Sequence, residues 1–390
     1  MRCISPLLVL PLFPIAHCLL PIALCHAADS PLPADAIESI RVNQVISAME
    51  AAIAKADIGA YMALVDPTDS VFATEQRAWI SDLQSHPVDD VEIVIAWNEP
   101  VRLQDDGSAI APIEIAWHVI GEELDRHFAY QALFEPVGAS NGQWIFAGRA
   151  WDVFDDGTQG VRVYSDIVHE DLAYLCADRV EHLRDEIAIN MGLDYSNTEP
   201  KEVVVKVYPD MSSLQASIYL SYTDRLSGWN EPGESIKILG RANYSVEQLD
   251  PLLAHEIGHA VSFEFGPEIN LAPWWTLEGI AEVASGLFRD SWESQNKRIV
   301  NLAKKDNLRD WALLADFRGE ANNHAMYVYL QGWSMVDYID RIHTIEKRNQ
   351  WFAQLGAGAT LDQASEKALG LSFAQLDANW HQSLLDTPSD

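Results

Sequence analysis

The chain has 390 residues, of which 48% are hydrophobic, and a formal net charge of -32 at pH 7. The hydrophobic fraction is sufficient for buried cores, and the length is typical of two domains plus a targeting segment. A surface this acidic repels nucleic acids and anionic membranes, so we expect neither as a partner.

Residues 1–28 have the form of a secretory signal peptide. Arg2 precedes a long apolar run, and Ala27 and Ala28 follow it as small residues suited to cleavage. The alternative is a retained membrane anchor, but four prolines interrupt the run. We therefore expect an exported protein, periplasmic or extracellular, with no integral membrane span after cleavage. Cys3, Cys18 and Cys25 lie in this segment. Cys176 is therefore the single cysteine left after cleavage, and we expect it to be buried.

The next part of the chain, 36–158, is expected to form an α+β domain. Helical patterns are followed by stretches that alternate with period two, which predicts helices and then an antiparallel sheet. The helical patterns cover 36–58, 61–65 and 75–83, and the strand-like stretches cover 91–97, 109–120, 127–136 and 143–154. This order of elements resembles the cystatin-like and SnoaL-like cone folds.

Five aromatic or histidine side chains of this domain have two interpretations. They can line a cone-shaped pocket, or they can fill the core of a curved sheet, and we favour the core. The residues are Trp97, Trp117, His118, His127 and Trp144. In the pocket interpretation, the domain positions a substrate or docks a partner. A separate alternative for the function makes this domain the functional part of the protein, which then binds a small ligand or a cell-envelope partner.

The remainder of the chain, 165–388, is expected to form a second α+β domain that ends in helices. A long helix is predicted from His169 to Met191, and the alternating stretches predict strands at 201–208 and 235–239. Between these strands a short helix is expected, followed by a loop over 227–233. Short helices are predicted from Trp351 to the end of the domain.

The sequence His255-Glu256-Ile257-Gly258-His259 has the form H-E-x-x-H. Residues four apart lie on one face of a helix, so both imidazoles can bind one zinc ion. Asp250 is expected to be the N-cap of this helix, with Pro251 at its first position. The alternative is a surface helix with two solvated histidines.

A second helix, predicted from Trp274 to Phe288, places Glu278 and Glu282 one turn apart. Two histidines and one carboxylate leave a fourth zinc position for water, which is typical of catalytic rather than structural sites. Glu256, which cannot reach the metal from its position on the helix, is expected to be the general base.

The H-E-x-x-H motif, eighteen further residues and then E-G-x-A resemble the gluzincin metallopeptidases. The stretch from Pro273 to Ala281 is most similar to the bacterial peptidase MA-like domains, and the resemblance covers 165–388. It implies a zinc metallopeptidase that acts on peptides or proteins, with Glu278 as third metal ligand. Glu282 would then hold a zinc-bound histidine by a hydrogen bond, although the reverse assignment, with Glu282 as ligand, stays open.

The resemblance also indicates a donor for the oxyanion that forms during hydrolysis. Aminopeptidase-N-like enzymes use the tyrosine of Y-x-K-G, and the stretch that starts at Tyr329 is similar, with Gln331 in place of lysine. Tyr327 and His324 are the rival candidates. A further alternative is that the ring of Tyr329 only packs in the core.

Two other implications concern the substrate. In gluzincins the strand before the zinc helix binds extended peptide, which makes 235–243 the candidate edge strand, although an ordinary interior strand is an equal alternative. The G-x-M-E-N motif that holds a free substrate amine is absent, since Gly240 to Asn243 lacks the glutamate. We therefore favour an endopeptidase over an aminopeptidase. The competing function is a protein that binds zinc without catalysis and acts as a cell-envelope scaffold.

Overall fold

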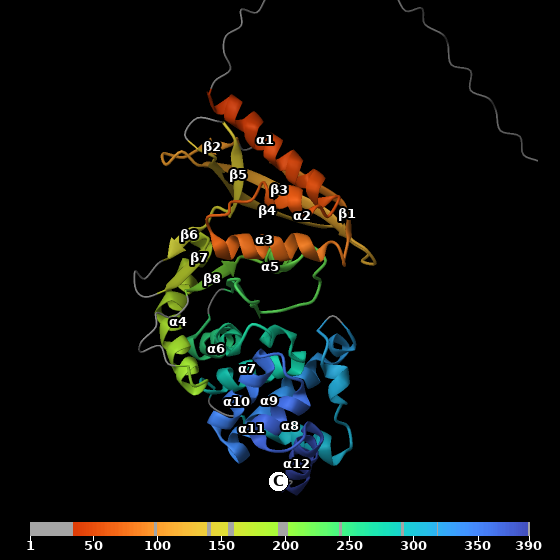
Figure 1. The fold of residues 1–390 in the computed structure, drawn as a ribbon. Helices are drawn as coiled ribbons and strands as arrows, with labels where there is room; N and C mark the ends of the chain where they lie inside the picture. The colour runs from red at the N-terminus through yellow and green to blue at the C-terminus, as the bar shows by residue number, and fades with distance from the viewer. Residues whose placement is uncertain are drawn as a thin grey trace, which may run out of the picture.

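The chain is α+β, as expected. The computed structural model describes residues 34–96, 100–138, 142–154, 160–193, 202–241, 244–289, 292–317 and 319–388 (Figure 1). The expected signal peptide and Trp97 lie outside these residues. Across the described ranges, every helix is too short or too polar to cross a lipid bilayer.

The first sheet is antiparallel and follows three helices, as the sequence predicted. Its strand order is β1-β3-β4-β5, with β2 paired to β3. The elements are α1 (Ala34–Ile53), α2 (Ile58–Met62), α3 (Ser70–Asp82), β1 (Val88–Ile95), β2 (Arg102–Leu103), β3 (Ala109–Val119), β4 (Arg126–Pro136) and β5 (Trp144–Arg149). Helix α3 begins after Asp69, whose carboxylate accepts a hydrogen bond from the Phe72 N–H (3.0 Å).

Two of the five residues that could line a pocket or fill the core belong to the core. Trp117 is 2% exposed and Trp144 is 7% exposed. The indole N–H of Trp117 donates to the carbonyl of Leu220 (2.9 Å), which ties the sheet to a later part of the chain. His118 is half-buried and His127 is exposed, so neither is a core residue. The core interpretation is confirmed for the two tryptophans.

The second sheet is mixed and has the order β6-β7-β8-β10-β9. Its three central strands are parallel, and the two outer strands are antiparallel to their neighbours. The elements are β6 (Asp152–Phe154), β7 (Val161–Ser165), α4 (Glu170–Asn190), β8 (Val203–Tyr208), α5 (Met211–Ile218), β9 (Gly228–Trp229) and β10 (Ile236–Leu239). Cys176 on α4 is free and fully buried, as expected.

One strand prediction was wrong. The stretch 143–154 forms two strands, because β5 ends at Arg149 and β6 pairs with β7 in the second sheet. For the strand before the zinc helix, the interior alternative is confirmed, because β10 lies between β8 and β9. The segment expected to be a loop folds back as β9, pairs with β10 and forms the edge itself.

The rest of the chain is helical. The helices are α6 (Val246–Ser262), α7 (Trp274–Gly286), α8 (Glu293–Lys304), α9 (Ala325–His343), α10 (Ile345–Gly356), α11 (Leu361–Leu369) and α12 (Phe373–Asp386), and short 3₁₀ turns are η1 (Ile167–His169), η3 (Phe263–Phe265), η4 (Ile269–Leu271), η5 (Trp311–Leu314) and η6 (Glu320–His324). One hydrophobic core extends from β7 through α4 to α12. In Figure 1 the two sheets occupy one half of the molecule and these helices the other.

Helix α6 begins earlier than expected. Its N-cap is Ser245, whose backbone N–H donates to the side chain of Gln248 (3.3 Å) in a capping box. Asp250 is therefore not the cap. Its carboxylate instead accepts two hydrogen bonds, of 2.9 and 2.7 Å, from the guanidinium of Arg179 on α4.

A buried ion network joins the first three helices to the second sheet. Glu75 on α3 lies 2.5 Å from the ammonium of Lys206 on β8 and 3.8 Å from that of Lys237 on β10. It also accepts hydrogen bonds from the backbone and hydroxyl of Ser235. All four residues are at most 6% exposed, so these contacts fix α3 to β8 and β10 of the second sheet.

We expect Glu75→Gln to destabilise the protein by about 3–5 kcal/mol, because it leaves a lysine buried without its partner. Urea unfolding followed by circular dichroism measures this loss. The same substitution at the exposed Glu92 of β1 is the control and should change the free energy of unfolding by less than about 0.5 kcal/mol. Equal stability of the two variants would contradict a structural role for the network.

The network also predicts a dependence of stability on pH. Burial raises the pKa of Glu75, but Lys206 and Lys237 outweigh it and lower that pKa to about 2. A lowered pKa in the folded state means that the stabilisation is present above the ordinary value of 4.5 and is lost as the pH falls towards 2. Wild-type protein should therefore lose more stability than Glu75→Gln over this window.

Candidate metal centre

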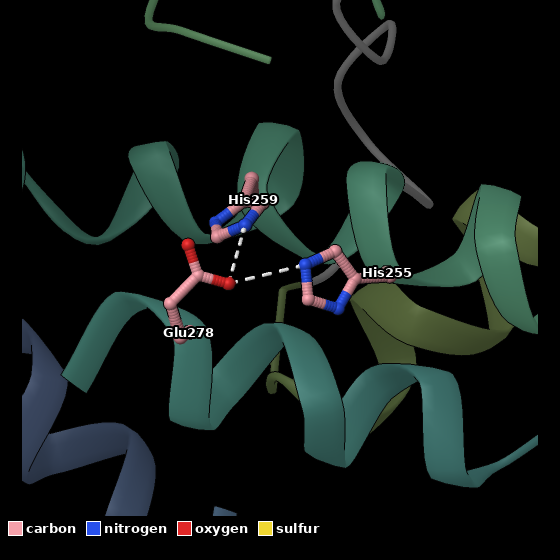
Figure 2. Close-up of side chains that lie close together, drawn as sticks. All are labelled: His255, His259 and Glu278. Carbon is pink, nitrogen blue, oxygen red and sulfur yellow. Dashed lines mark ion pairs between the residues drawn. The ribbon is translucent and has the colours of Figure 1, made fainter. Parts of the chain in front are cut away.

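Helix α6 presents both histidines of the H-E-x-x-H motif on one face. His255 and His259 point from α6 towards Glu278 on α7, as Figure 2 shows. The position of Glu278 follows from the predicted second helix, which the structure confirms as α7. The structure therefore brings together the three side chains that the sequence singled out.

Small residues at the crossing of α6 and α7 allow this approach. A Cβ on Gly258 would lie 2.8 Å from the Cβ of Ala284 and 3.0 Å from the Cα of Ala281. Any larger residue at position 258 would push the helices apart. Gly258 lies between the two histidines in sequence, so the contact holds both imidazoles close to the carboxylate on α7.

The distances between donor atoms suit a tetrahedral ion. Nε2 of His255 lies 3.2 Å from Oε2 of Glu278, and Nε2 of His259 lies 3.5 Å from the same oxygen. All three donor atoms lie within 4.8 Å of one another. Zinc with tetrahedral bonds of about 2.1 Å keeps its donors about 3.4 Å apart, so these side chains can share one ion with little movement.

The two oxygens of Glu278 have different surroundings. Oε1 accepts a hydrogen bond of 2.7 Å from the indole N–H of Trp274, which fixes the carboxylate. Oε2 is buried and has no hydrogen-bond partner. A buried carboxylate oxygen without a donor is costly, and a metal ion supplies the missing interaction. The residues present therefore fit a zinc ion.

Glu282 lies on the other side of His255. Its Oε1 is 3.2 Å from Nδ1 of His255, and its Oε2 is 3.4 Å from the guanidinium of Arg289. Because Nε2 of His255 faces Glu278, Glu282 is placed to orient the ring rather than to share the ion. This geometry favours Glu278 over Glu282 as the ligand.

The protonation of these groups reflects their burial and mutual proximity. Burial alone would lower the pKa of His255, but Glu278 and Glu282 raise it well above its usual value. Burial alone would raise the pKa of Glu278, but the two imidazoles lower it below its usual range. For Glu256 burial dominates and raises the pKa. Several carboxylates thus surround two imidazoles, a charge balance that a divalent cation improves.

Glu256 lies against the edge strand of the second sheet. It is 5% exposed and lines a cleft of about 1020 Å³ together with both histidines. A Cβ on Gly228 of β9 would lie 2.3 Å from Oε1 of Glu256, so any other residue there would displace this carboxylate. The cleft can hold an extended chain beside β9, within reach of Glu256.

Tyr329 lines the same cleft, with its ring centroid 5.9 Å from that of His255. Burial, and then the nearby glutamates, raise the pKa of its phenol well above the usual value, which keeps it a hydrogen-bond donor. The rivals lie elsewhere: Tyr327 packs under the guanidinium of Arg309 (4.4 Å), and His324 lies 3.3 Å from Glu320.

The position of Tyr329 depends on a second close helix crossing. A Cβ on Gly279 of α7 would lie 2.6 Å from the carbonyl oxygen of Gly332, and a Cβ on Gly332 would lie 2.3 Å from that of Trp275. The glycines of E-G-x-A and of the stretch after Tyr329 therefore meet at one point. Gln331, which replaces the expected lysine, is buried and hydrogen-bonds the backbone of Arg309.

Sequence reasoning missed the contribution of 228–231 to the cleft. Glu231, two residues after β9, lines the cleft, and its carboxylate has a 3.5 Å contact with the amide of Asn270. Burial and the neighbouring Glu234 raise its pKa to about 7. A strand of two residues gives no alternating pattern, so only the glycine beside an aromatic residue could have indicated it.

Comparisons of the whole chain with protein-family models and with curated proteins give no match. The resemblance to gluzincins therefore depends on the residues described above.

The contact between Trp274 and Glu278 leads to a test of the metal centre. We expect Trp274→Phe to weaken zinc binding by about 10–100-fold, because it removes the donor that orients the ligand carboxylate. Competition with a chromogenic chelator measures the affinity.

The matched control is Trp275→Phe. The indole N–H of Trp275 is buried without a partner, so this change removes similar ring volume but no hydrogen bond. It should leave zinc affinity within about threefold of wild type. Equal losses in the two variants would show that packing, and not the hydrogen bond, is responsible.

Proposed function

We propose that the protein is an exported zinc-dependent peptidase that hydrolyses peptide bonds in peptides or proteins. One observation carries the proposal. Oε2 of Glu278 is buried without a hydrogen-bond partner and lies 3.2 and 3.5 Å from Nε2 of two histidines. The cleft beside this cluster is large enough for a peptide segment, and export is proposed from residues 1–28.

The chemistry follows from the groups that line the cleft. A bound zinc would polarise the scissile carbonyl and lower the pKa of water towards about 7. Glu256 accepts the proton of the attacking water and then delivers it to the leaving amine. Tyr329 donates a hydrogen bond to the carbonyl oxygen as negative charge develops on it. Glu282 keeps the ring of His255 in the orientation that directs Nε2 at the metal.

The alternative function is a zinc-binding scaffold without catalysis. The surroundings of Glu256 argue against it. This carboxylate is buried, and its pKa is raised by burial, although it is not a metal ligand in the proposed site. A scaffold gains nothing from a buried carboxylate in this position, whereas hydrolysis requires a base there.

We expect Glu256→Gln to retain zinc and to lose peptide hydrolysis by a factor of about 10²–10⁴. Zinc content by mass spectrometry and cleavage of a quenched-fluorescent peptide library measure the two effects. Glu247→Gln, the same change at an exposed position of α6, should retain full activity.

Two outcomes would reject parts of the proposal. Bound zinc with equal hydrolysis, or none, in wild type and Glu256→Gln would remove the enzyme and leave the scaffold. Wild-type protein that takes up no zinc would remove both functions and leave the first domain as the functional part.

A second candidate activity is that of an aminopeptidase. The preference for an endopeptidase depended on the lack of a glutamate near the edge strand to hold a free amine. Glu231 supplies a half-buried carboxylate two residues after β9, on the wall of the cleft. With a pKa of about 7, it would gain a full negative charge beside a substrate ammonium group.

A pair of peptides separates the two activities. An endopeptidase should cleave N-acetylated and free-amine versions of one long peptide with kcat/KM values within about threefold, in wild type and in Glu231→Gln. An aminopeptidase should release single residues from the free peptide only, and Glu231→Gln should lower that kcat/KM by about tenfold or more. Internal cleavage of the acetylated peptide rejects the aminopeptidase, and its complete resistance rejects the endopeptidase.

A further inference from the structure

A second cavity, of about 370 Å³, lies where the first sheet meets the second. Its walls come from α1 and α3, from β4 and β5, and from β8 and α5. Small-molecule sites in proteins begin at about 300 Å³, so this cavity is large enough for a small ligand. This cavity shares no lining residue with the cleft beside His255, so it is a separate site.

One wall of the cavity is aromatic. Phe128 and Tyr130 on β4 are stacked, with ring centroids 5.2 Å apart and an interplanar angle of 8°. Both side chains line the cavity and are half-buried, whereas Phe134 on the same strand is fully buried. The rings pack against the core of the first domain and also present apolar surface to the cavity. A flat apolar group can pack on this surface.

One cation of the cavity wall has no acidic partner. The guanidinium of Arg149 lies over the rings of Tyr130 (5.3 Å) and Trp151 (4.9 Å). Among the described residues, no carboxylate lies within ion-pair distance of it. It follows a β-bulge in β5, where Gly148 has a φ of +96°. Bulges of this kind redirect the next side chain, and here that side chain lines the cavity.

The acidic groups near this cation are occupied by other partners. Asp166 and Asp210 act on the charge of Arg149 from a distance. Asp166 contacts the ring of His169 (2.8 Å), and Asp210 accepts hydrogen bonds from Ser213. Four further acids line the cavity wall, and none of them is within ion-pair distance of Arg149: Asp66, Asp69, Glu75 and Glu135. Asp69 caps α3 by accepting a hydrogen bond from the Phe72 N–H (3.0 Å).

Asp66 and Glu75 have partners of their own. Asp66 accepts hydrogen bonds from the backbone and hydroxyl of Thr68, and Glu75 is paired with Lys206. Arg149 is thus a half-buried cation whose hydrogen-bond donors are not matched by a carboxylate of the described chain. The complementary group is an anion supplied by a ligand.

We propose that this cavity binds a small organic anion with a flat apolar body, whose carboxylate pairs with Arg149 and whose body packs on Phe128 and Tyr130. The fork of a guanidinium matches a carboxylate in two parallel hydrogen bonds. The aromatic rings hold the guanidinium plane and contact the body of the ligand. The site is independent of the metal centre and needs no zinc.

The test uses the full-length protein and two probes of nearly equal shape, 2-naphthoate and the uncharged 2-naphthalenemethanol. Isothermal titration should show one binding site for 2-naphthoate in wild type. Arg149→Met should weaken 2-naphthoate by about tenfold or more and the alcohol by less than about threefold, because only the anion loses a charge-assisted contact.

Two variants control the measurement. Arg77→Met makes the same change at an exposed position of α3 and should leave both affinities unchanged. Ser217→Phe places a ring in the cavity and should abolish binding of both probes. If Arg149→Met shows no cooperative unfolding transition and is therefore not folded, Ser217→Phe replaces it as the decisive variant.

The proposal is overturned if 2-naphthoate fails to bind wild type with one-to-one stoichiometry. It is also overturned if 2-naphthoate binds Arg149→Met or Ser217→Phe as tightly as wild type, since the anion then binds elsewhere, for example at the zinc. Equal weakening of the two probes by Arg149→Met would reject an anion site and leave only apolar contact.

Discussion

The close packing of α7 against both α6 and α9 is the constraint on which the candidate metal centre depends. Gly258 and Gly279 lie at the two crossings, and a Cβ at either position would collide with the neighbouring helix. The first crossing brings the histidines to Glu278, and the second brings Tyr329 to the same cleft. Small residues in these helices therefore determine the distances among larger ones, and the geometry of the candidate site is a property of helix packing.

The close packing buries charged groups, and these groups must compensate one another. The helices bury Glu256 and Glu278 beside two imidazoles, and Oε2 of Glu278 lacks a donor. Buried carboxylates are stable only when paired, so an isolated site of this composition would be a weak point of the fold. A divalent cation would remove that weakness and, in the proposed function, would supply the Lewis acid for hydrolysis. The same rule applies at Glu75, where two lysines compensate the charge.

The helices and the close approach of His255, His259 and Glu278 could be predicted from the sequence because their signals are local. Residues four apart share a helix face whatever surrounds them, so His255 and His259 could be paired without a structure. The edge strand could not be predicted, since β9 has only two residues and forms through its pairing with β10. Asp250 was misassigned as a cap because its partner, Arg179, lies on a helix that is distant in sequence. Arg149 gave no signal, because a cavity depends on how two sheets meet.

X-ray absorption at the zinc edge of the wild-type protein tests the central claim most directly. The account predicts four light ligands at about 2.0–2.2 Å, two of them with the outer-shell scattering of imidazole, and the other two a carboxylate oxygen and a solvent oxygen. A shell of six oxygens without imidazole scattering would contradict it. So would a shell that contains sulfur at about 2.3 Å, because zinc would then be bound away from α6 and α7.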